Sequence, residues 1–192
     1  MGKSVVFIDR DGTINEEAGY INHIDSFKIF DFVPQAIRLL NIHNILVIVV
    51  TNQGGIARNY FSEELVKEIH KKMANDLKNK GAILDGIYYC PHYPKAKHPL
   101  YGIDCDCRKP KDGLIQQALR DFQIDKNRMF VIGDKWTDLE LGEKIGAKKI
   151  LVRTGYGKGE ILSNQNNPIQ PDIITENLLY AVYEILSILK NN

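Results

Sequence analysis

The chain has 192 residues, of which 44% are hydrophobic and 26% are charged, and its formal net charge is +1 at pH 7. This balance is typical of a globular α/β protein and excludes the compositions of disordered and membrane-spanning chains. No block of basic residues indicates a nucleic-acid partner. The first residues lead directly into strand sequence, without an apolar leader or anchor. We therefore expect one monomeric domain over residues 1–192, in the cytoplasm and with no membrane partner.

The first predicted strand covers residues 5–8 and ends in two carboxylates. All four residues are apolar, which is typical of a strand buried on both faces of a parallel sheet. Asp9 and Asp11 follow, and Gly12 allows a sharp turn. Ligands of open α/β sheets bind at the carboxyl ends of strands. The pair is therefore a candidate metal site or a nucleophile and an acid, although Asp-Gly is also a common turn signal.

A second strand with a polar end is predicted at residues 45–50. Before it, residues 14–32 are irregular and indicate a loop or small hairpin, and Pro34 marks the start of a helix. Thr51 and Asn52 follow the strand and precede two glycines, a pattern that can hold a phosphate group. Taken alone, the pattern also fits an ordinary glycine-rich loop.

Helices and strands alternate through the rest of the chain. Ser62 is expected to cap a long helix, Asp112 a shorter one, and Thr175 the C-terminal helix. The glycine-rich stretch 155–159 is predicted to be a flexible loop. The remaining strands are predicted at residues 83–89, 129–132, 148–152 and 173–174. This alternation predicts an α/β fold with a doubly wound parallel sheet.

A zinc-binding loop is predicted at residues 90–107. It holds every cysteine of the chain in a Cys-x-His…Cys-x-Cys pattern, with the ligands at Cys90, His92, Cys105 and Cys107. Three thiols and an imidazole complete the closed tetrahedral shell of a structural zinc ion. The segment between the pairs has no apolar periodicity and would depend on the metal for its fold. His98 is a weaker candidate ligand, and the alternative is three free thiols that lie near one another.

Charged residues gather after the zinc loop and after the strand at 129–132. Arg108 and Lys109 form either a solvated charge run or an anion clamp. Asp134 and Asp138 are a second carboxylate pair at a strand end. Carboxylates, a lysine and hydroxyl or amide donors at one sheet edge are typical of phosphoryl transfer at a magnesium ion. No P-loop sequence is present, so a P-loop NTPase is not expected.

Four motifs in this order resemble those of the haloacid dehalogenase-like phosphatases. They are Asp9-Arg10-Asp11-Gly12-Thr13, Thr51-Asn52, Lys109 and Gly133-Asp134-x-x-x-Asp138. Residues 51–58 and 90–110 resemble a narrower group that includes phosphatases of heptose 1,7-bisphosphate and of histidinol phosphate. Residues 93–104, together with Gly19-Tyr20 and Ile24-Asp25, are more similar to the heptose group. Asn59 and Asp112 depart from the pattern, where glycine and proline are usual.

The resemblance implies a Mg²⁺-dependent phosphatase of a small sugar bisphosphate, with no large cap domain and a structural Zn²⁺. Asp9 would be the nucleophile that forms an aspartyl-phosphate, and Asp11 the general acid and base. Magnesium would be bound by Asp9, Asp134 and the Asp11 carbonyl, and the phosphoryl group by Thr51, Asn52, Gln53 and Lys109. Lys135 and Asp138 would support the site, and Asp138 would orient Lys109 or a metal-bound water. A second phosphate or the sugar would be contacted by Arg58, Arg108 and Lys158.

Three alternatives remain open at this point. The nearest is a histidinol-phosphate phosphatase of the same group. A zinc-stabilised binding module without catalysis is disfavoured because all four catalytic motifs are complete. A receiver-type phospho-acceptor domain would need neither the zinc loop nor an acid at Asp11.

Overall fold

The computed structural model describes residues 2–191, and its six strands form a single parallel sheet in the order β3-β2-β1-β4-β5-β6. The strands are β1 (Lys3–Ile8), β2 (Leu46–Asn52), β3 (Gly86–Cys90), β4 (Ile124–Gly133), β5 (Lys148–Val152) and β6 (Ile173–Thr175). From central β1 the chain adds strands outward on one side and then returns to add β4 on the other. The connections that follow β1 and β4 therefore diverge, which opens a crevice at the carboxyl ends of these two strands.

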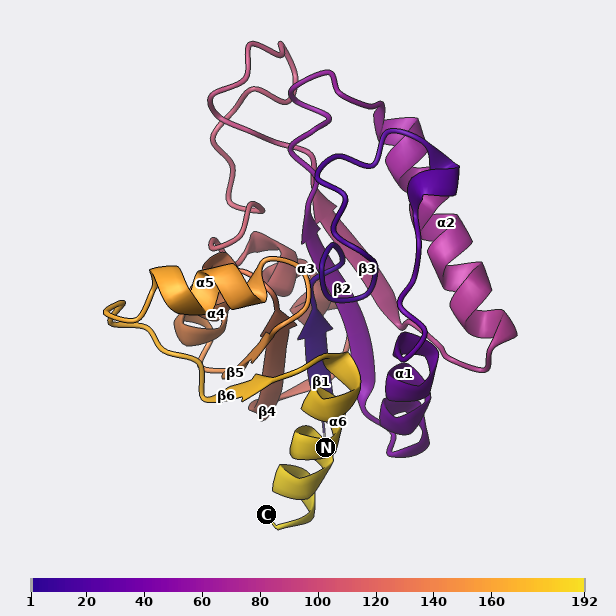
Figure 1. The fold of residues 1–192 in the computed structure, drawn as a ribbon, viewed down its shortest axis with the longest axis vertical. Coiled ribbons are helices and arrows are strands. Elements are labelled where there is room, and N and C mark those ends of the chain that lie inside the picture. Colours follow the sequence, from indigo (N-terminus) through magenta and orange to yellow (C-terminus); the bar gives the residue numbers. More distant parts are fainter. Residues whose placement is uncertain (1, 192) are drawn as a thin grey trace.

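Helices cover both faces of the sheet (Figure 1). One face carries α1 (Val33–Ile42), α2 (Glu63–Asn79) and α6 (Leu178–Lys190), and the other carries α3 (Gly113–Asp121) and α4 (Trp136–Lys144), with α5 (Gly157–Ser163) beside α4. Each side has its own apolar core, because alternate residues of the buried strands point to opposite faces. The predicted doubly wound α/β fold is confirmed.

Of the three predicted helix caps, Ser62 is confirmed, Asp112 holds the predicted N-cap position without a capping bond, and Thr175 is wrong. The C-terminal helix is capped by Asn177, whose side chain accepts hydrogen bonds from Leu179 N and Tyr180 N, while Thr175 is the last residue of β6. Asp112 precedes α3 but makes no capping bond, because its carboxylate instead accepts a hydrogen bond from Gln116 and pairs with Lys144.

The stretch predicted as a flexible loop at residues 155–159 instead enters α5. Its Gly157 packs so closely on the Val152 carbonyl that an added Cβ would lie 1.8 Å from that oxygen. Strand limits also differ from the prediction: β3 starts later, because Asp85 turns aside to accept a hydrogen bond from Val47 N. Strand β4 starts earlier and pairs with Lys3 before an irregularity.

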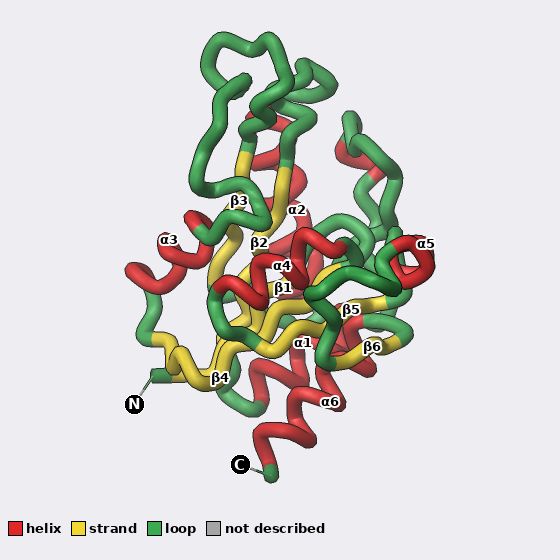
Figure 2. Tube along the Cα trace, turned by 90° about the vertical axis from the view of Figure 1, so that its left-hand side faces the viewer, coloured by secondary structure: helices red, strands yellow, loops and turns green. Residues whose placement is uncertain are grey.

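Two long loops extend beyond the carboxyl end of the sheet. They cover residues 9–32, with the short 3₁₀ helix η1 (Ile24–Ser26), and residues 91–112. Figure 2 shows the second loop reaching well past β2 and β3. The crevice between β1 and β4 therefore has walls made of loops. Among residues 2–191, no helix combines the length and the apolar sequence that a membrane span needs.

Candidate active site and metal centres

A buried lysine lies at the centre of the crevice. Lys109, from the end of the long loop, places its ammonium 2.6 Å from Asp9 Oδ1 and 2.6 Å from Asp138 Oδ1, and it also donates to the Val50 carbonyl. Burial alone would lower the pKa of Lys109, but the carboxylates of Asp138 and Asp9 outweigh burial and raise it. The lysine is therefore a fixed cation beside Asp9.

Three carboxylates surround one point next to this cation. Oxygen atoms of Asp9, Asp134 and Asp138 all lie within 4.8 Å of one another, and all three side chains are buried. Burial and the nearby Asp9 raise the pKa of Asp134 to about 8. Burial also raises the pKa of Asp138 to about 6, against the opposing effect of Lys109. The group thus carries more negative charge than Lys109 balances, which is the condition that a bound divalent cation relieves.

Asp134 presents one oxygen that suits a cation. Its Oδ2 accepts a hydrogen bond from Tyr156 N, but within residues 2–191 its buried Oδ1 has no hydrogen-bond partner. Gly12 and Gly155 both adopt positive φ here, and a Cβ on either would lie 2.1 Å from Asp134 Oδ2. These glycines let two turns close over the carboxylate. The hard oxygen donors of this group fit Mg²⁺.

Asp11 is not part of this carboxylate group. Arg10 donates to it from Nε and Nη2, Asn15 Nδ2 donates at 3.0 Å, and Gln53 Nε2 donates at 2.9 Å. Burial would raise the pKa of Asp11, but Arg10 and these hydrogen bonds outweigh it and lower the pKa. The two carboxylates of the first motif therefore have opposite surroundings, one beside a candidate cation site and one held by a buried guanidinium.

The second motif is tied to both neighbours. Asn52 Oδ1 accepts from Lys109 N and its Nδ2 donates to the Lys109 carbonyl, so β2 fixes the loop that carries the lysine. Gln53 Nε2 bonds Thr51 Oγ1 as well as Asp11. The structure therefore brings together the residues of all four motifs.

A cavity of about 560 Å³ opens above these residues. Its walls come from both long loops, from the turn after β2 and from the start of α4. Among its lining residues are the predicted ligand-binding residues Asn52, Gln53, Arg58, Arg108 and Lys109, together with Lys135. Lys158, which was expected to reach the same ligand, does not line this cavity and lies exposed on α5.

Two guanidinium groups share one tyrosine ring at the mouth of the cavity. The Arg58 guanidinium carbon lies 3.9 Å from the Tyr93 ring centroid, and that of Arg108 lies 5.2 Å from it. Arg58 also donates to the Tyr20 hydroxyl, and Arg108 to the His92 carbonyl. Stacking on aromatic faces holds both cations while leaving donor groups for an anion. The rim is therefore a candidate anion-binding surface, separate from Lys109.

On the other side of the cavity, Lys135 lies over the Tyr156 ring and pairs with Glu17 at 3.1 Å. Burial would lower the pKa of Lys135, but the negative charges of Asp9, Asp134 and Glu17 outweigh it and raise the pKa. Lys135 thus partly offsets the charge of the carboxylate group.

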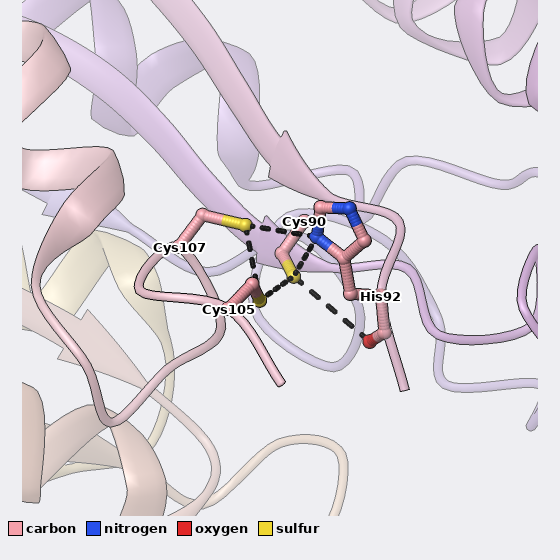
Figure 3. Close-up of side chains that lie close together, drawn as sticks. All are labelled: Cys90, His92, Cys105 and Cys107. Carbon is pink, nitrogen blue, oxygen red and sulfur yellow. Dashed lines mark hydrogen bonds between the residues drawn. The ribbon is translucent and has the colours of Figure 1, made fainter. Parts of the chain in front are cut away.

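The four predicted zinc ligands lie close together and point toward one another (Figure 3). Cys90 Sγ is 3.6 Å from Cys105 Sγ, Cys107 Sγ is 3.3 Å from Cys105 Sγ, and His92 Nδ1 is 3.2 Å from Cys107 Sγ. All three cysteines are free, and these separations are far longer than a disulfide bond of about 2.05 Å. Ligands about 2.0–2.3 Å from one zinc ion stand roughly 3.3–3.8 Å apart, which agrees with this cluster.

The electrostatics of the cluster also fit a cation. The hydrogen bond from Cys90 is the largest effect that lowers the pKa of the Cys107 thiol, to about 5. The same contact raises the pKa of Cys90, and burial raises that of Cys105. The cluster by itself therefore favours one thiolate, and a metal would have to displace the other protons.

His98 is not part of the cluster. Its Nδ1 accepts hydrogen bonds from Leu100 N and Tyr101 N, so it shapes a turn of the same loop.

The sequence did not reveal the aromatic rim or the side chains that bind Asp11. Tyr93 follows His92 by one residue, and that adjacency to a ligand motif was the only available signal. Asn15 carried no pattern at all.

The chain matches known phosphatases in sequence and in structure. A family model described as HAD-hydrolase-like matches residues 106–181. The D-glycero-beta-D-manno-heptose-1,7-bisphosphate 7-phosphatase of Haemophilus ducreyi is 48% identical over 157 residues, which cover 81% of this chain and 86% of that protein. The corresponding alpha enzyme of Photorhabdus laumondii is 38% identical, covering 83% of this chain and 88% of that protein.

A solved structure agrees with these relatives. The D,D-heptose 1,7-bisphosphate phosphatase of B. bronchiseptica, crystallised with magnesium and phosphate, has a TM-score of 0.84 at 27% identity, covering 96% of this chain and 99% of that one. The chain thus belongs to the haloacid dehalogenase-like phosphatases and is a hydrolase of phosphoric monoesters. Within that family, its resemblance to the heptose 1,7-bisphosphate phosphatases is confirmed.

Magnesium should stabilise the protein more at high pH than at low pH. The pKa of Asp134 is about 8 in the folded protein against an ordinary 3.8, so the metal-free folded state holds an extra proton between these values and loses stability as the pH rises through them. A cation displaces that proton. At one fixed Mg²⁺ concentration, 100 times the Kd at pH 8, we expect Mg²⁺ to add about 2.7 kcal/mol at pH 8 and clearly less at pH 6, where the Kd is higher.

Thermal unfolding with Mg²⁺ or with EDTA at both pH values measures this difference. Asp134→Asn should remove most of the Mg²⁺ effect, whereas the exposed Asp31→Asn should keep it. An unchanged Mg²⁺ shift in Asp134→Asn would exclude Asp134 as a ligand.

Proposed function

We propose that the protein removes the C7 phosphate of D-glycero-D-manno-heptose 1,7-bisphosphate, a step in the supply of activated heptose precursors. The observation that carries this proposal is the pairing of one deep phosphoryl site, at Asp9 and Lys109, with a second cationic site at the cavity rim. A bisphosphate has one group for each site. The names of the relatives support heptose over histidinol phosphate, which carries only one phosphate.

In this proposal Asp9 is the nucleophile. Its carboxylate attacks phosphorus, the bond to the C7 oxygen breaks, and an aspartyl-phosphate forms on Asp9. Lys109 contacts Asp9 Oδ1 directly, so its charge stands where the transferring oxygens would gather negative charge. Thr51 and Asn52 lie at the neighbouring strand end and supply hydroxyl and amide donors. Asp138 orients Lys109 through the 2.6 Å ion pair.

Asp11 is proposed as the general acid and base. It would donate a proton to the departing C7 alkoxide, and then accept one from the water that hydrolyses the aspartyl-phosphate. Arg10, Asn15 and Gln53 hold its carboxylate at the cavity wall, where a leaving group can be reached. Gln53 also joins Asp11 to Thr51, which links the proton-transfer group to the phosphoryl site.

Asp9 and Asp134, with the Asp11 main-chain carbonyl, are proposed to hold Mg²⁺, and Asp138 completes the buried carboxylate group beside them. A bound Mg²⁺ would offset the repulsion between Asp9 and the incoming phosphate. The unpartnered Asp134 Oδ1 and the raised pKa of Asp134 support this assignment.

The rim is proposed to bind the C1 phosphate. Arg58 and Arg108 stack near Tyr93, and both line the same cavity as Lys109.

The loop that presents Arg108 and Lys109 begins at the Cys3His cluster, for which we propose a structural Zn²⁺. No open coordination position remains there for a substrate, so the metal would act by fixing the loop.

Phosphate release from the heptose 1,7-bisphosphate, with Mg²⁺ and with EDTA, tests the proposed function. The β anomer should be the better substrate, because the 48% identical relative carries the beta name, whereas the relative with the alpha name is only 38% identical. Asp9→Asn should lower kcat by about 10³-fold or more, since the amide cannot form the acyl-phosphate. Asp31→Asn is the matched control. Faster release from histidinol phosphate than from the heptose would overturn the substrate assignment.

Loss of a rim cation should affect the bisphosphate selectively. Arg108→Ala should lower kcat/KM for heptose 1,7-bisphosphate by about 10- to 100-fold, the value of one charge-assisted hydrogen bond. The same variant should act on heptose 7-phosphate nearly as well as the unmodified protein does, because that substrate lacks the C1 phosphate. Arg128→Ala, which removes an arginine paired with Asp125 away from the cavity, should change neither value. Equal losses on both substrates would place Arg108 at the reacting phosphate instead.

Elemental analysis of freshly purified protein, kept free of chelators, should find about one zinc ion per chain. Cys105→Ser should lose this zinc and weaken activity on the bisphosphate, because Arg108 and Lys109 follow the cluster directly. His98→Ala is the control in the same loop and should retain the metal. Full activity in a zinc-free preparation would remove the proposed structural role.

A further inference from the structure

Arg10 is a buried cation whose hydrogen bonds go to two different residues, Asp11 and His70. Its side chain is only 2% exposed and lies against the Phe27 ring. The Nε and Nη2 donors face Asp11, whereas Nη1 lies 3.1 Å from His70 Nε2 on α2. A guanidinium can present more than one edge to a carboxylate. The contact with His70 engages Nη1 and so leaves the Nε–Nη2 edge for Asp11.

His70 is neutral and acts as an acceptor in this contact. Burial and the adjacent Arg10 lower the pKa of His70 to about 3, so the ring carries no charge at neutral pH. Because Nη1 of Arg10 is a donor, His70 Nε2 is the lone-pair nitrogen and its proton is on Nδ1. His70 therefore adds no charge to the site.

The His70 ring is itself held in place. It meets the Tyr89 ring edge-on with centroids 5.3 Å apart. The Tyr89 hydroxyl donates to Glu63 at the start of α2, and Glu63 also accepts from Tyr101 in the zinc-binding loop. A continuous set of contacts thus runs from that loop through α2 to the first motif.

We propose that His70 is a positioning residue for Asp11, acting through Arg10. By accepting from Nη1, it fixes the edge of the guanidinium that holds the Asp11 carboxylate and thereby sets where Asp11 exchanges its proton. This inference rests on the proposed role of Asp11 as general acid and base. Asp11 and Arg10 belong to the first motif, but His70 belongs to none of the four motifs.

The test compares two substitutions and two substrates. His70→Phe keeps an aromatic ring against Tyr89 but removes the acceptor, whereas His70→Gln restores an acceptor oxygen. The heptose bisphosphate has a poor alkoxide leaving group that needs an acid, and p-nitrophenyl phosphate has a good one that does not. We expect His70→Phe to lower kcat about 10-fold on the heptose with little change in KM, and to lower it less than 2-fold on the aryl phosphate. His70→Gln should recover most of the activity.

Ile69→Val, in the same helix and within the core, controls for destabilised packing and should leave the ratio of the two activities unchanged. Equal losses on both substrates or no recovery with glutamine would overturn the inference.

Asp11→Asn separates this inference from the proposed function. If Asp11→Asn leaves the ratio of the two activities unchanged, the role of Asp11 as acid fails and the inference fails with it. If Asp11→Asn reduces the heptose activity selectively but His70→Phe does not, only the inference about His70 fails.

Discussion

The site depends on one buried ion pair network. Lys109 is 4% exposed and lies between Asp9, which follows β1, and Asp138, which lies on α4 after the neighbouring strand β4. Removing one partner from such a buried group typically costs about 3–5 kcal/mol, because the remaining charge has no water to replace it. The end of β1, the start of α4 and the end of the long loop must therefore be in place together. Asn52 adds the end of β2 through two hydrogen bonds to the Lys109 backbone.

The charges of the crevice are divided between two regions. Near the sheet, carboxylates outnumber cations, and burial raises the pKa of Asp134 and Asp138. At the rim, Arg58 and Arg108 lie near a single aromatic ring. The net charge of the whole chain, only +1, gives no indication of this separation. The inner region therefore attracts cations, whereas the rim attracts anionic groups.

The fold and the grouping of the candidate site residues could be predicted because their signals are periodic or clustered. Apolar runs identified most strands, and polar residues directly after them identified the sheet edge. Positions at which neighbouring residues could play the same structural part were harder to predict. Asn177 rather than Thr175 caps α6, and Gly157, which packs against Val152, begins a helix rather than a loop. His70 could not be found from sequence, since its contact with Arg10 spans 60 residues and belongs to no motif.

The division between strand ends and loops has a consequence for how such a site can diversify. Asp134 is packed between turns that leave no room for even a methyl group at Gly12 or Gly155. Tyr20, Arg58 and Tyr93 instead come from surface loops, where changes of size and charge are tolerated better. Replacement of rim side chains can therefore change the shape and charge of the cavity mouth without disturbing the packing at the sheet edge.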